Sequence, residues 1–503
     1  MAVIIFCAKF LGLLREIMIA GVYGQGYASD VLNTSTQIPL LFFDMTLGVA
    51  ILSTFVPVFN MYLERDGRER AIEFSNNFMT IVMSAAALFS AVGIIFAEPI
   101  VRLMVPGWNA AKVAETASLL RMLFPSIIFT AAAYTSVGIL QSFGEFNIPS
   151  VISVVSNLIM ILYLLIVGNR FGLAGVIVSM VIAWASQLLI QIPPLRRYGY
   201  RYRPALNLRD EGIAEAARLA VPVLISSWVQ PLCIVINMAF GSGMGDGAVT
   251  SLNWANKIYI IMVGVFAYAV TNFIFPKLSR MSAGDDNEAF AETTRLSLGW
   301  IILIIAYISA MFIALNKPII KVVFERGAFT ADNTELTSSA LFYYSFGMVG
   351  YAICEVLNKS FYAIHDGKTP MLASVAGVVF NFAAAFVFVR AINLGLGGLA
   401  LASASSSIFI ALILLVMINK RKRGVISRGF VINSLKALAA AAVCCVAARL
   451  VYGFTDSLAG GGFVITLVKL AFSALAALIL YVVLGFALRL DETKQIRRFK
   501  NGK

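Results

Sequence analysis

Charge is scarce in this sequence. Only 13% of its 503 residues are Asp, Glu, Lys or Arg, and 60% are hydrophobic. A soluble protein carries about 25% charged residues, so this chain lacks the polar surface that a water-soluble body of its size needs. The composition therefore excludes a soluble globular protein.

The residue types that most often carry enzyme chemistry are scarce as well. The chain has one histidine, His365, and five cysteines, all in apolar segments. Their spacing suits neither a zinc site nor a disulfide framework, and the sequence has no P-loop and no nucleophile elbow. We expect no enzymatic activity, no cofactor and no metal, and an energy source other than ATP hydrolysis.

Long apolar runs dominate what is present. They are about 18 to 25 residues long, which is the length that spans a bilayer, and short polar segments separate them. This pattern predicts an all-α polytopic membrane protein of about fourteen transmembrane helices. The predicted spans are 2–22, 31–60, 76–98, 115–140, 147–168, 172–194, 214–238, 248–275, 295–315, 337–360, 370–391, 396–419, 432–453 and 464–488.

The basic residues give the chain a net charge of +13. They cluster in the segments 65–70, 196–209, 277–280 and 420–423 and in the tail after Asp491, whereas the alternate loops carry fewer. Because Lys and Arg mark cytoplasmic loops, we predict that both termini are cytoplasmic. The charge therefore indicates membrane topology, and we expect no nucleic-acid partner.

A weak internal repeat divides the chain. Residues 146–179 and 367–402 each contain a proline, then an asparagine, then a Gly-x-x-Gly turn. The matching positions are Pro149 and Pro370, Asn157 and Asn381, Gly172 and Gly395, and Gly175 and Gly398. The copies lie about six spans apart, an even number, so they keep the same orientation and form a parallel repeat.

The repeat predicts two six-helix lobes related by a pseudo-two-fold axis along the membrane normal. We place the N-terminal lobe at 1–195 and the C-terminal lobe at 196–425. An accessory helix pair follows at 426–490, and a basic cytoplasmic tail at 491–503. Such repeats normally place the substrate path between the lobes.

Ionisable side chains within the first two spans are candidate site residues, because a charge in the membrane is costly. The first span holds Lys9, Arg15 and Glu16, and the second holds Asp30 at its mouth and Asp44 in its middle. Lys9 and Glu16 are two helical turns apart and share a face, with Arg15 about 100° to one side. An alternative is that Lys9 reaches from its span end to the interface.

Later spans add further candidates. Lys257 lies near Asn253 and Asn256 in the span 248–275. Glu355 and Lys359 are four residues apart in the span 337–360 and can pair on one helix face, in which case they simply neutralise each other. Asn237 and Asn381 could bind a coupling ion or serve polar helix packing.

Several cations with few acids favour an anionic substrate, since a guanidinium grips a phosphate through two parallel hydrogen bonds. We therefore expect Arg15, Lys9 and Lys257, together with Asp30, to bind the substrate, with Asp44 among the auxiliary residues. A cation-coupled drug exporter would need more acids and aromatics around the site. A third alternative is a non-transporting membrane scaffold that recruits enzymes.

Prolines and glycines interrupt several spans, where broken backbone is tolerated only beside protein or a wet cavity. Gly48, Gly264 and Gly347 are candidate bending points, and close helix packing is the alternative. The prolines are Pro39, Pro57, Pro125, Pro222, Pro231 and Pro276.

With these segments assigned, the chain resembles the MurJ (MviN) lipid II flippase family, within the multidrug/oligosaccharidyl-lipid/polysaccharide exporter superfamily. The resemblance covers nearly the whole chain and begins with Lys-Phe-Leu-Gly-Leu-Leu-Arg-Glu at 9–16. The other motifs lie at 23–30, 38–41, 54–57, 106–108, 146–149, 255–257, 323–330, 361–363 and 368–370. The resemblance implies two six-helix lobes around a cationic cavity in the bacterial inner membrane. It also implies a lipid-side groove for a polyprenyl tail, formed by the last helix pair.

Residue by residue, the resemblance is uneven. Arg15 matches a cavity arginine of the family and Asp30 its acidic residue, while Lys9 and Lys257 stand where the family usually has arginine. The family's adjacent arginine pair falls on Phe43 and Asp44, and its following acidic residue falls on Gly48. The resemblance implies a lipid II flippase working by alternating access. The departures leave open another polyprenyl-diphosphate-linked oligosaccharide as cargo, and a coupling cation, membrane lipids and cell-wall synthesis proteins are possible partners.

Overall fold

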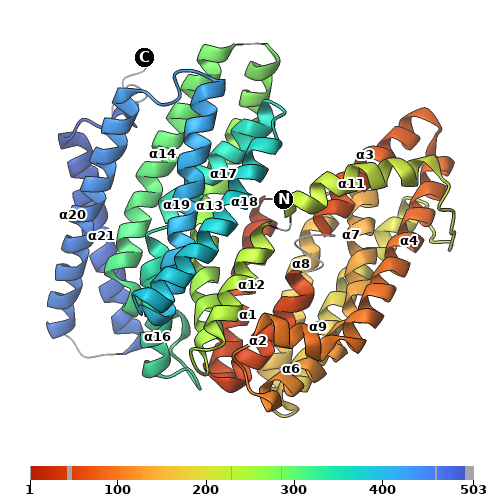
Figure 1. The fold of residues 1–503 in the computed structure, drawn as a ribbon, viewed down its shortest axis with the longest axis horizontal. Coiled ribbons are helices and arrows are strands. Elements are labelled where there is room, and N and C mark those ends of the chain that lie inside the picture. Colours follow the sequence, from red (N-terminus) through yellow and green to blue (C-terminus); the bar gives the residue numbers. More distant parts are fainter. Residues whose placement is uncertain (1, 42–47, 228, 285, 459–461, 493–503) are drawn as a thin grey trace. The chain divides into compact units, whose positions relative to one another are not determined.

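The structure, a computed structural model, describes residues 2–41, 48–227, 229–284, 286–458 and 462–492. All regular secondary structure in these ranges is helical, which confirms the predicted all-α fold (Figure 1). Contacts group the chain into two compact units. Unit 1 is Met1–Thr250 with Arg326–Phe329, and unit 2 is Ser251–Glu325 with Thr330–Lys503. The lobe boundary at 195/196 stays a prediction.

Unit 1 contains the first twelve helices. They are α1 (Ala2–Tyr23), α2 (Tyr27–Pro39), α3 (Val49–Arg65), α4 (Arg68–Ile95), α5 (Ala97–Met104), α6 (Ala110–Leu123), α7 (Ser126–Ser142), α8 (Asn147–Ile166), α9 (Gly172–Leu189), α10 (Ile192–Arg197), α11 (Glu211–Ser227) and α12 (Val229–Gly241).

Unit 2 contains most of α13 and all later helices. The segment 326–329, between α15 and α16, belongs to unit 1. The helices are α13 (Ala248–Ala283), α14 (Asn287–Ala314), α15 (Asn316–Phe324), α16 (Ala331–Ser345), α17 (Met348–Ala363), α18 (Lys368–Phe386), α19 (Gly395–Arg421), α20 (Arg428–Leu458) and α21 (Phe463–Ala487). A π-helical turn, Val387–Ala391, follows α18.

Among the described residues, nine helices are long and apolar enough to cross a membrane, or eleven if each of two bent pairs is one span. The remaining predicted spans fall on α1, on α2 with α3, and on α11 with α12. Three charges in α1 lower its hydropathy, and the two pairs are each made of short helices. The chain is thus a multi-pass membrane protein, and the count of fourteen stays a prediction.

Two spans bend where the sequence predicts an interruption. Pro125 lies between α6 and α7, whose axes differ by 43°, and Gly347 lies between α16 and α17, whose axes differ by 50°. Proline removes a backbone donor from the helix ladder. At Gly347 the bend is accompanied by close helix packing, because an added Cβ would lie 2.5 Å from the Cα of Ala404 on α19.

The two repeat segments have the same local geometry. α9 begins at Gly172 with φ +56°, and α19 begins at Gly395 with φ +55°. This left-handed conformation is open to glycine at little steric cost. Each turn leads into a helix that packs on the helix before it, α8 on α9 and α18 on α19. The repeat motif therefore encodes one helical hairpin, used once in each unit.

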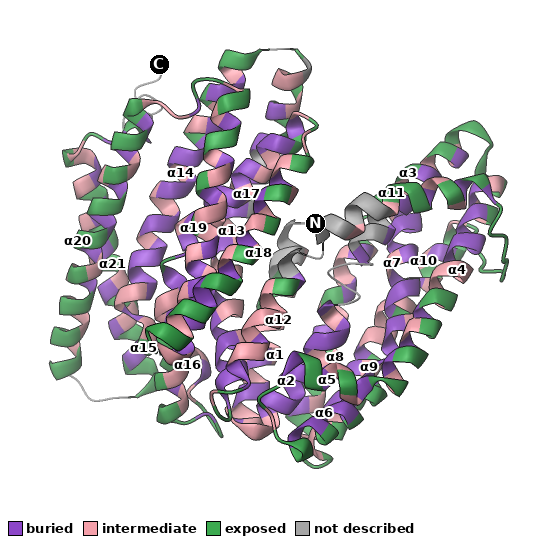
Figure 2. Ribbon diagram, viewed as in Figure 1, coloured by how far each residue is buried: buried purple, intermediate pink, exposed green. Residues whose placement is uncertain are grey.

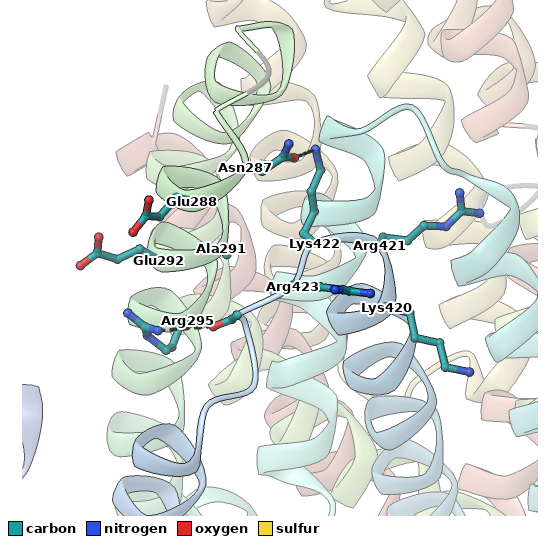
Figure 3. A pocket seen from close by; sticks show the side chains of 10 residues that line it. Asn287, Glu288, Ala291, Glu292, Arg295, Lys420, Arg421, Lys422 and Arg423 are labelled. Carbon is teal, nitrogen blue, oxygen red and sulfur yellow. Dashed lines mark hydrogen bonds between the residues drawn. The ribbon is translucent and has the colours of Figure 1, made fainter.

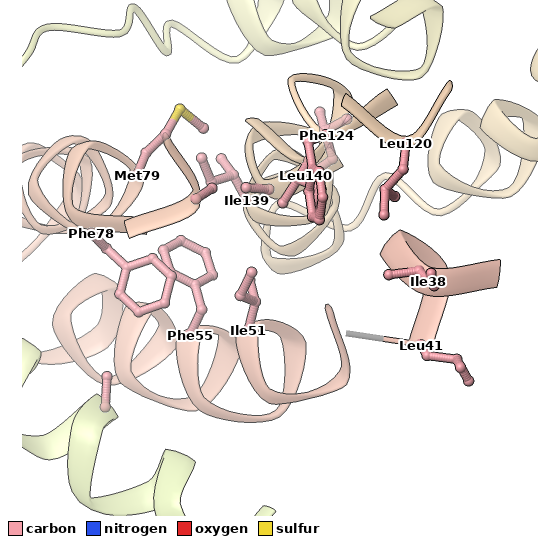
Figure 4. Packing of buried hydrophobic residues seen from close by; sticks show 14 of the residues in the cluster. Ile38, Leu41, Ile51, Phe55, Phe78, Met79, Leu120, Phe124, Ile139 and Leu140 are labelled. Atoms are coloured by element: carbon pink, nitrogen blue, oxygen red, sulfur yellow. The ribbon is translucent and has the colours of Figure 1, made fainter. Parts of the chain in front are cut away.

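Aromatic packing builds the core of unit 1. Phe55 on α3 stacks on Phe59 and Phe74 with ring centroids 5.4 and 5.7 Å apart, and Phe78 lies 5.0 Å from it. Figure 4 shows Phe55 and Phe78 facing the side chain of Ile139 on α7. The cluster joins α3, α4 and α7 and so holds these three helices of unit 1 together.

The last two helices of unit 2 carry long exposed apolar faces. Figure 2 shows much of α20 and α21 as exposed, and the exposed residues are largely Leu, Val, Ile and Phe. Two tyrosine hydroxyls join α21 to α14: Tyr307 of α14 donates to the carbonyl of Ala474 at 2.6 Å, and Tyr481 of α21 donates to that of Leu303 at 2.9 Å. An apolar face of this length suits lipid contact.

The segment 326–329 belongs to unit 1 although its neighbours on both sides belong to unit 2. The backbone N–H of Ala328 donates to the carbonyl of Gly21 at the end of α1, at 2.8 Å. Gly24 has φ +64°, and a Cβ there would lie 2.5 Å from the carbonyl oxygen of Ala328. Only glycine allows this approach, so α1 ends against the inserted segment.

We predict that Gly347→Ala destabilises the protein, because the new methyl group overlaps α19 and overpacking costs about 1–3 kcal/mol. Gly453→Ala is the matched control, since a Cβ at this helical glycine meets nothing within 4 Å. The unfolding temperature of the purified variants in one detergent measures both effects. Equal unfolding temperatures for the two variants would contradict the close α17–α19 approach.

Candidate transport site

Arg15 lies on α1, where its guanidinium spans two partners. Its Nη2 donates to Oε1 of Glu16 at 2.7 Å, and its Nη1 donates to Oδ1 of Asn157 on α8 at 3.1 Å. The side chain is 25% exposed and its Nε has no acceptor within the described residues. The two hydrogen bonds therefore fix the orientation of the guanidinium, and the Nε–H stays without an acceptor among the described residues.

Asn157 orients this arginine from α8. Its Nδ2 donates to the carbonyls of Ala8 at 3.3 Å and Ser153 at 2.8 Å, so its Oδ1 points at Arg15. From the sequence Asn157 stands out only as a repeat marker. A polar residue in the middle of an apolar span was the available signal.

Asp30 lies at the centre of a buried network in unit 1. Its Oδ2 accepts from Nζ of Lys112 and from the backbone N–H of Gly247, both at 2.8 Å. Its Oδ1 accepts from the hydroxyl and the backbone N–H of Thr250, at 2.7 and 3.0 Å. Lys112 also reaches Oδ1 of Asp246 at 2.6 Å. The Asp30 side chain is 0% exposed and that of Lys112 is 3% exposed.

Two aromatic rings complete this network around the ammonium of Lys112. The ammonium lies 4.2 Å from the ring centroid of Trp108 and 5.2 Å from that of Tyr27. A cation over such ring faces is stabilised electrostatically. Asp30 thus holds α2, α6 and the N-terminal end of α13 together, and in this conformation four donors occupy its carboxylate.

The other predicted cations are placed separately in the two units. Lys9 is exposed on α1, and Lys257 is partly buried on α13, one turn from Asn253 and next to Asn256. Glu355 and Lys359 are both partly buried on α17. The ammonium of Lys359 lies 5.7 Å from the ring centroid of Phe275.

The two asparagines considered for a coupling ion belong to different units. Asn237 is partly buried on α12 of unit 1. Asn381 is buried on α18 of unit 2, where its Nδ2 donates to the hydroxyl of Ser403 on α19 at 3.3 Å. This bond favours polar helix packing for Asn381, although its Oδ1 has no partner among the described residues.

Phe43 and Asp44 lie outside the described residues, so their structure is not discussed. Gly48, at the position of the family's next acidic residue, is buried at the start of α3. A Cβ at Gly48 would lie 3.3 Å from the ring of Tyr134. A larger side chain at this position would therefore require the tyrosine to move.

An apolar groove of about 470 Å³ runs between α14, α17, α19 and α20 of unit 2. Small residues make room for it: Ala306 and Ala310 on α14, Gly350 on α17, and Ala411 on α19. Larger side chains, Leu412 among them, complete its walls. Of the final helix pair, α20 lines the groove, and the residues that line it include none from α21. An apolar groove at a lipid-exposed helix suits a hydrocarbon chain.

A basic pocket of about 630 Å³ lies where α14 begins and α19 ends (Figure 3). Three of the cations that line it are engaged: Arg295 donates to the carbonyl of Gly424 at 3.3 Å, Lys422 bonds Asn287, and Arg421 pairs with Asp366 at 3.3 Å. Burial by itself raises the pKa of Asp366, but hydrogen bonds from Thr369 and the charge of Arg421 outweigh it and lower that pKa. The pocket acts as a clasp between helix ends.

Fold and site together define a polytopic helical transporter. A MATE family transporter of the MOP superfamily in an inward-facing conformation has this fold, with a TM-score of 0.69, 16% identity, and coverage of 83% of this chain and 95% of the other. A lipid II flippase MurJ in an inward closed conformation matches with a TM-score of 0.80 and 22% identity, over 97% of this chain and 99% of the other.

The family model described as "Lipid II flippase MurJ" matches residues 19–473, and the chain belongs to this family. A probable lipid II flippase MurJ of Vibrio cholerae is 26% identical over 396 residues, 76% of this chain and 75% of the relative. The lipid II flippase MurJ of Burkholderia cenocepacia is 24% identical, over 76% of each chain. The membership confirms the predicted family and the prediction of a transporter rather than an enzyme.

We predict that Lys112→Met destabilises the protein by about 3–5 kcal/mol, because it leaves the buried charge of Asp30 without its cation. Adding Asp30→Asn to this variant restores part of the loss, since the charge is then removed. A double-mutant cycle on thermal unfolding in detergent measures the coupling. Lys317→Met, at an exposed ion pair with Glu335, is the control and costs little. Additive losses at Asp30 and Lys112 would rule out the coupling.

Proposed function

We propose that this chain translocates lipid II, the lipid-linked peptidoglycan precursor, across the bacterial cytoplasmic membrane by alternating access. The family match over residues 19–473 carries the proposal. The relatives that bear the name lipid II flippase, in Vibrio cholerae and Burkholderia cenocepacia, support the same cargo. In the proposed topology both termini are cytoplasmic.

The head group of the cargo is a diphosphate that carries a sugar, and Arg15 is its proposed anchor. The guanidinium is held by Glu16 and Asn157, the side chain is partly exposed, and the Nε–H has no acceptor among the described residues. A pre-oriented guanidinium loses little entropy when it binds phosphate oxygens. Lys9 and Lys257 are further proposed phosphate contacts, as compact charges rather than planar forks.

Asp30 stays in the proposed set, with a condition that the structure adds. Its carboxylate is saturated in this conformation, so contact with the head group requires it to release one of its donors. The auxiliary residues are Asp44, Asn253, Asn256, Glu355 and Lys359, and Asn237 and Asn381 are proposed for a coupling cation.

The polyprenyl tail is proposed to follow the apolar groove on α20. The groove has a hydrocarbon lining and lies on helices with exposed apolar faces. A long hydrocarbon placed there stays out of water while the head group moves, so the transporter needs to desolvate only the polar part of its cargo.

A second cargo has one specific argument in its favour. Phe43 and Asp44 replace the arginine pair that the family resemblance places there, and fewer cations weaken the grip on a diphosphate. Another polyprenyl-diphosphate-linked oligosaccharide would then be the natural alternative, since it shares both the diphosphate and the tail.

We expect expression of this chain to rescue cells depleted of their own lipid II flippase, and Arg15→Ala to abolish the rescue. Arg15→Lys keeps the charge and is expected to retain part of it. Arg102→Ala removes an exposed arginine paired with Glu98 and is expected to rescue fully. Growth and the fraction of lipid II accessible from outside are the measurements.

Two results of this experiment would count against the proposal. If Arg15→Ala, expressed at wild-type level, transported normally, the anchor role would be lost. If the inserted wild-type chain gave no lipid II transport, the cargo would be another polyprenyl-linked glycan. In that case Phe43→Arg with Asp44→Arg would be the first variant to test for gain of transport.

For the groove, we predict that Ala442→Phe, which places a ring among its lining residues, reduces transport severalfold. Ala439→Phe adds the same ring to an exposed position of α20 that does not line the groove. Lipid II translocation in vesicles with matched protein content compares the two. Equal rates would show that the tail does not use the groove.

A further inference from the structure

Unit 1 contains a pocket that has no part in the proposed transport mechanism. It measures about 650 Å³ and lies between α4, α7, the α9–α10 end and the segment 200–202. Its wall is mainly apolar, formed by Met79 and Met83 on α4, Ala132 on α7, Leu188 near the end of α9 and Ile192 at the start of α10. The lining is thus suited to hydrocarbon.

One end of this pocket is positively charged. Arg196 and Arg201 line it and are both exposed. In the described part of the chain neither guanidinium has a carboxylate within 4 Å. This contrasts with the basic pocket at α14, where Glu288 and Glu292 also line the wall and most cations are engaged. Two guanidinium groups that line one pocket without a carboxylate partner are suited to bind an anion.

A buried hydroxyl provides a separate observation. Ser136 on α7 lines the pocket and is 0% exposed, and its Oγ has no hydrogen-bond partner among the described residues. A buried polar group without a partner costs free energy. A ligand oxygen that enters the pocket between the apolar wall and the arginines would satisfy it.

The pocket lies at the level where a membrane surface is expected. Arg196 lies in the last turn of the apolar stretch Gly172–Arg197, which is long enough to span a bilayer, and the basic segment 196–209 begins at this end. Basic pockets at the ends of transmembrane helices recognise anionic lipid head groups. The segment 200–202 is itself fixed to α4, because Tyr202 and Thr80 share a hydrogen bond of 3.0 Å and Tyr200 contacts the sulfur of Met79.

We propose that this pocket binds one anionic phospholipid of the surrounding bilayer. The phosphate lies between Arg196 and Arg201, a glycerol or ester oxygen accepts from Ser136, and an acyl chain follows Met83, Leu188 and Ile192. This lipid is a resident of the pocket and not the cargo. The inference therefore goes beyond the proposed function and does not depend on which glycan is carried.

Native mass spectrometry of the full-length protein in detergent tests the proposal. The protein is titrated with phosphatidylglycerol, with phosphatidylcholine of the same acyl chains, and with soluble glycerophosphoglycerol. We expect phosphatidylglycerol to bind at least tenfold more tightly than phosphatidylcholine, and the soluble head group to bind weakly. The Arg196→Gln/Arg201→Gln variant should lose this preference about tenfold.

The matched control is Arg203→Gln/Arg209→Gln, which removes two exposed arginines from the same segment but none from the pocket. It should keep the preference. A second variant, Met83→Trp, fills the apolar wall without changing charge and should lower phosphatidylglycerol binding. Equal binding of the two lipids, equal loss in both arginine variants, or full competition by glycerophosphoglycerol would each overturn the proposal.

Discussion

A charge buried in a membrane protein is not hydrated and must be stabilised by protein groups. The ion pair between Asp30 and Lys112 shows how this constraint is met. Neither side chain reaches solvent, yet every acceptor position of the carboxylate is used and the ammonium also rests on two aromatic rings. Because the donors come from α6 and from the N-terminal end of α13, satisfying one charge joins segments far apart in sequence. The same constraint explains why Arg15 is held by Glu16 and Asn157 rather than left to lipid.

Helix breaks in this chain follow the same physics. A broken helix exposes backbone groups, so each break stands where neighbouring helices cover it. Pro125 and Gly347 bend two spans by similar angles, one by removing a donor and the other by allowing contact with α19. The matched left-handed turns at Gly172 and Gly395 show one solution used twice. Bends and turns, more than side-chain contacts, give the two units their related hairpins.

Composition and periodicity were sufficient to predict the all-helical membrane fold, because apolar length alone separates a span from a soluble helix. They also led to Arg15, since an arginine inside an apolar run is unmistakable. They could not reveal the partners of Asp30, because Lys112 and Thr250 are distant from it in sequence. The family resemblance implied a groove at the last helix pair, but the residue pattern could not reveal which residues line it, because alanines and Gly350 from four helices meet there. Local pattern predicts elements, whereas a site depends on which elements become neighbours.

The insertion of residues 326–329 into unit 1 has a consequence for anyone who divides this protein. A fragment ending at Thr250 would contain every helix of unit 1 and still be incomplete. It would lack the donor for the carbonyl of Gly21 and the backbone that covers Gly24. The chain therefore cannot be cut at one position into two fragments that each contain a complete unit. If the two halves were coexpressed, residues 326–329 would have to be added to the first half. A circular permutant cut within this segment would lose the backbone that α1 contacts at its C-terminal end.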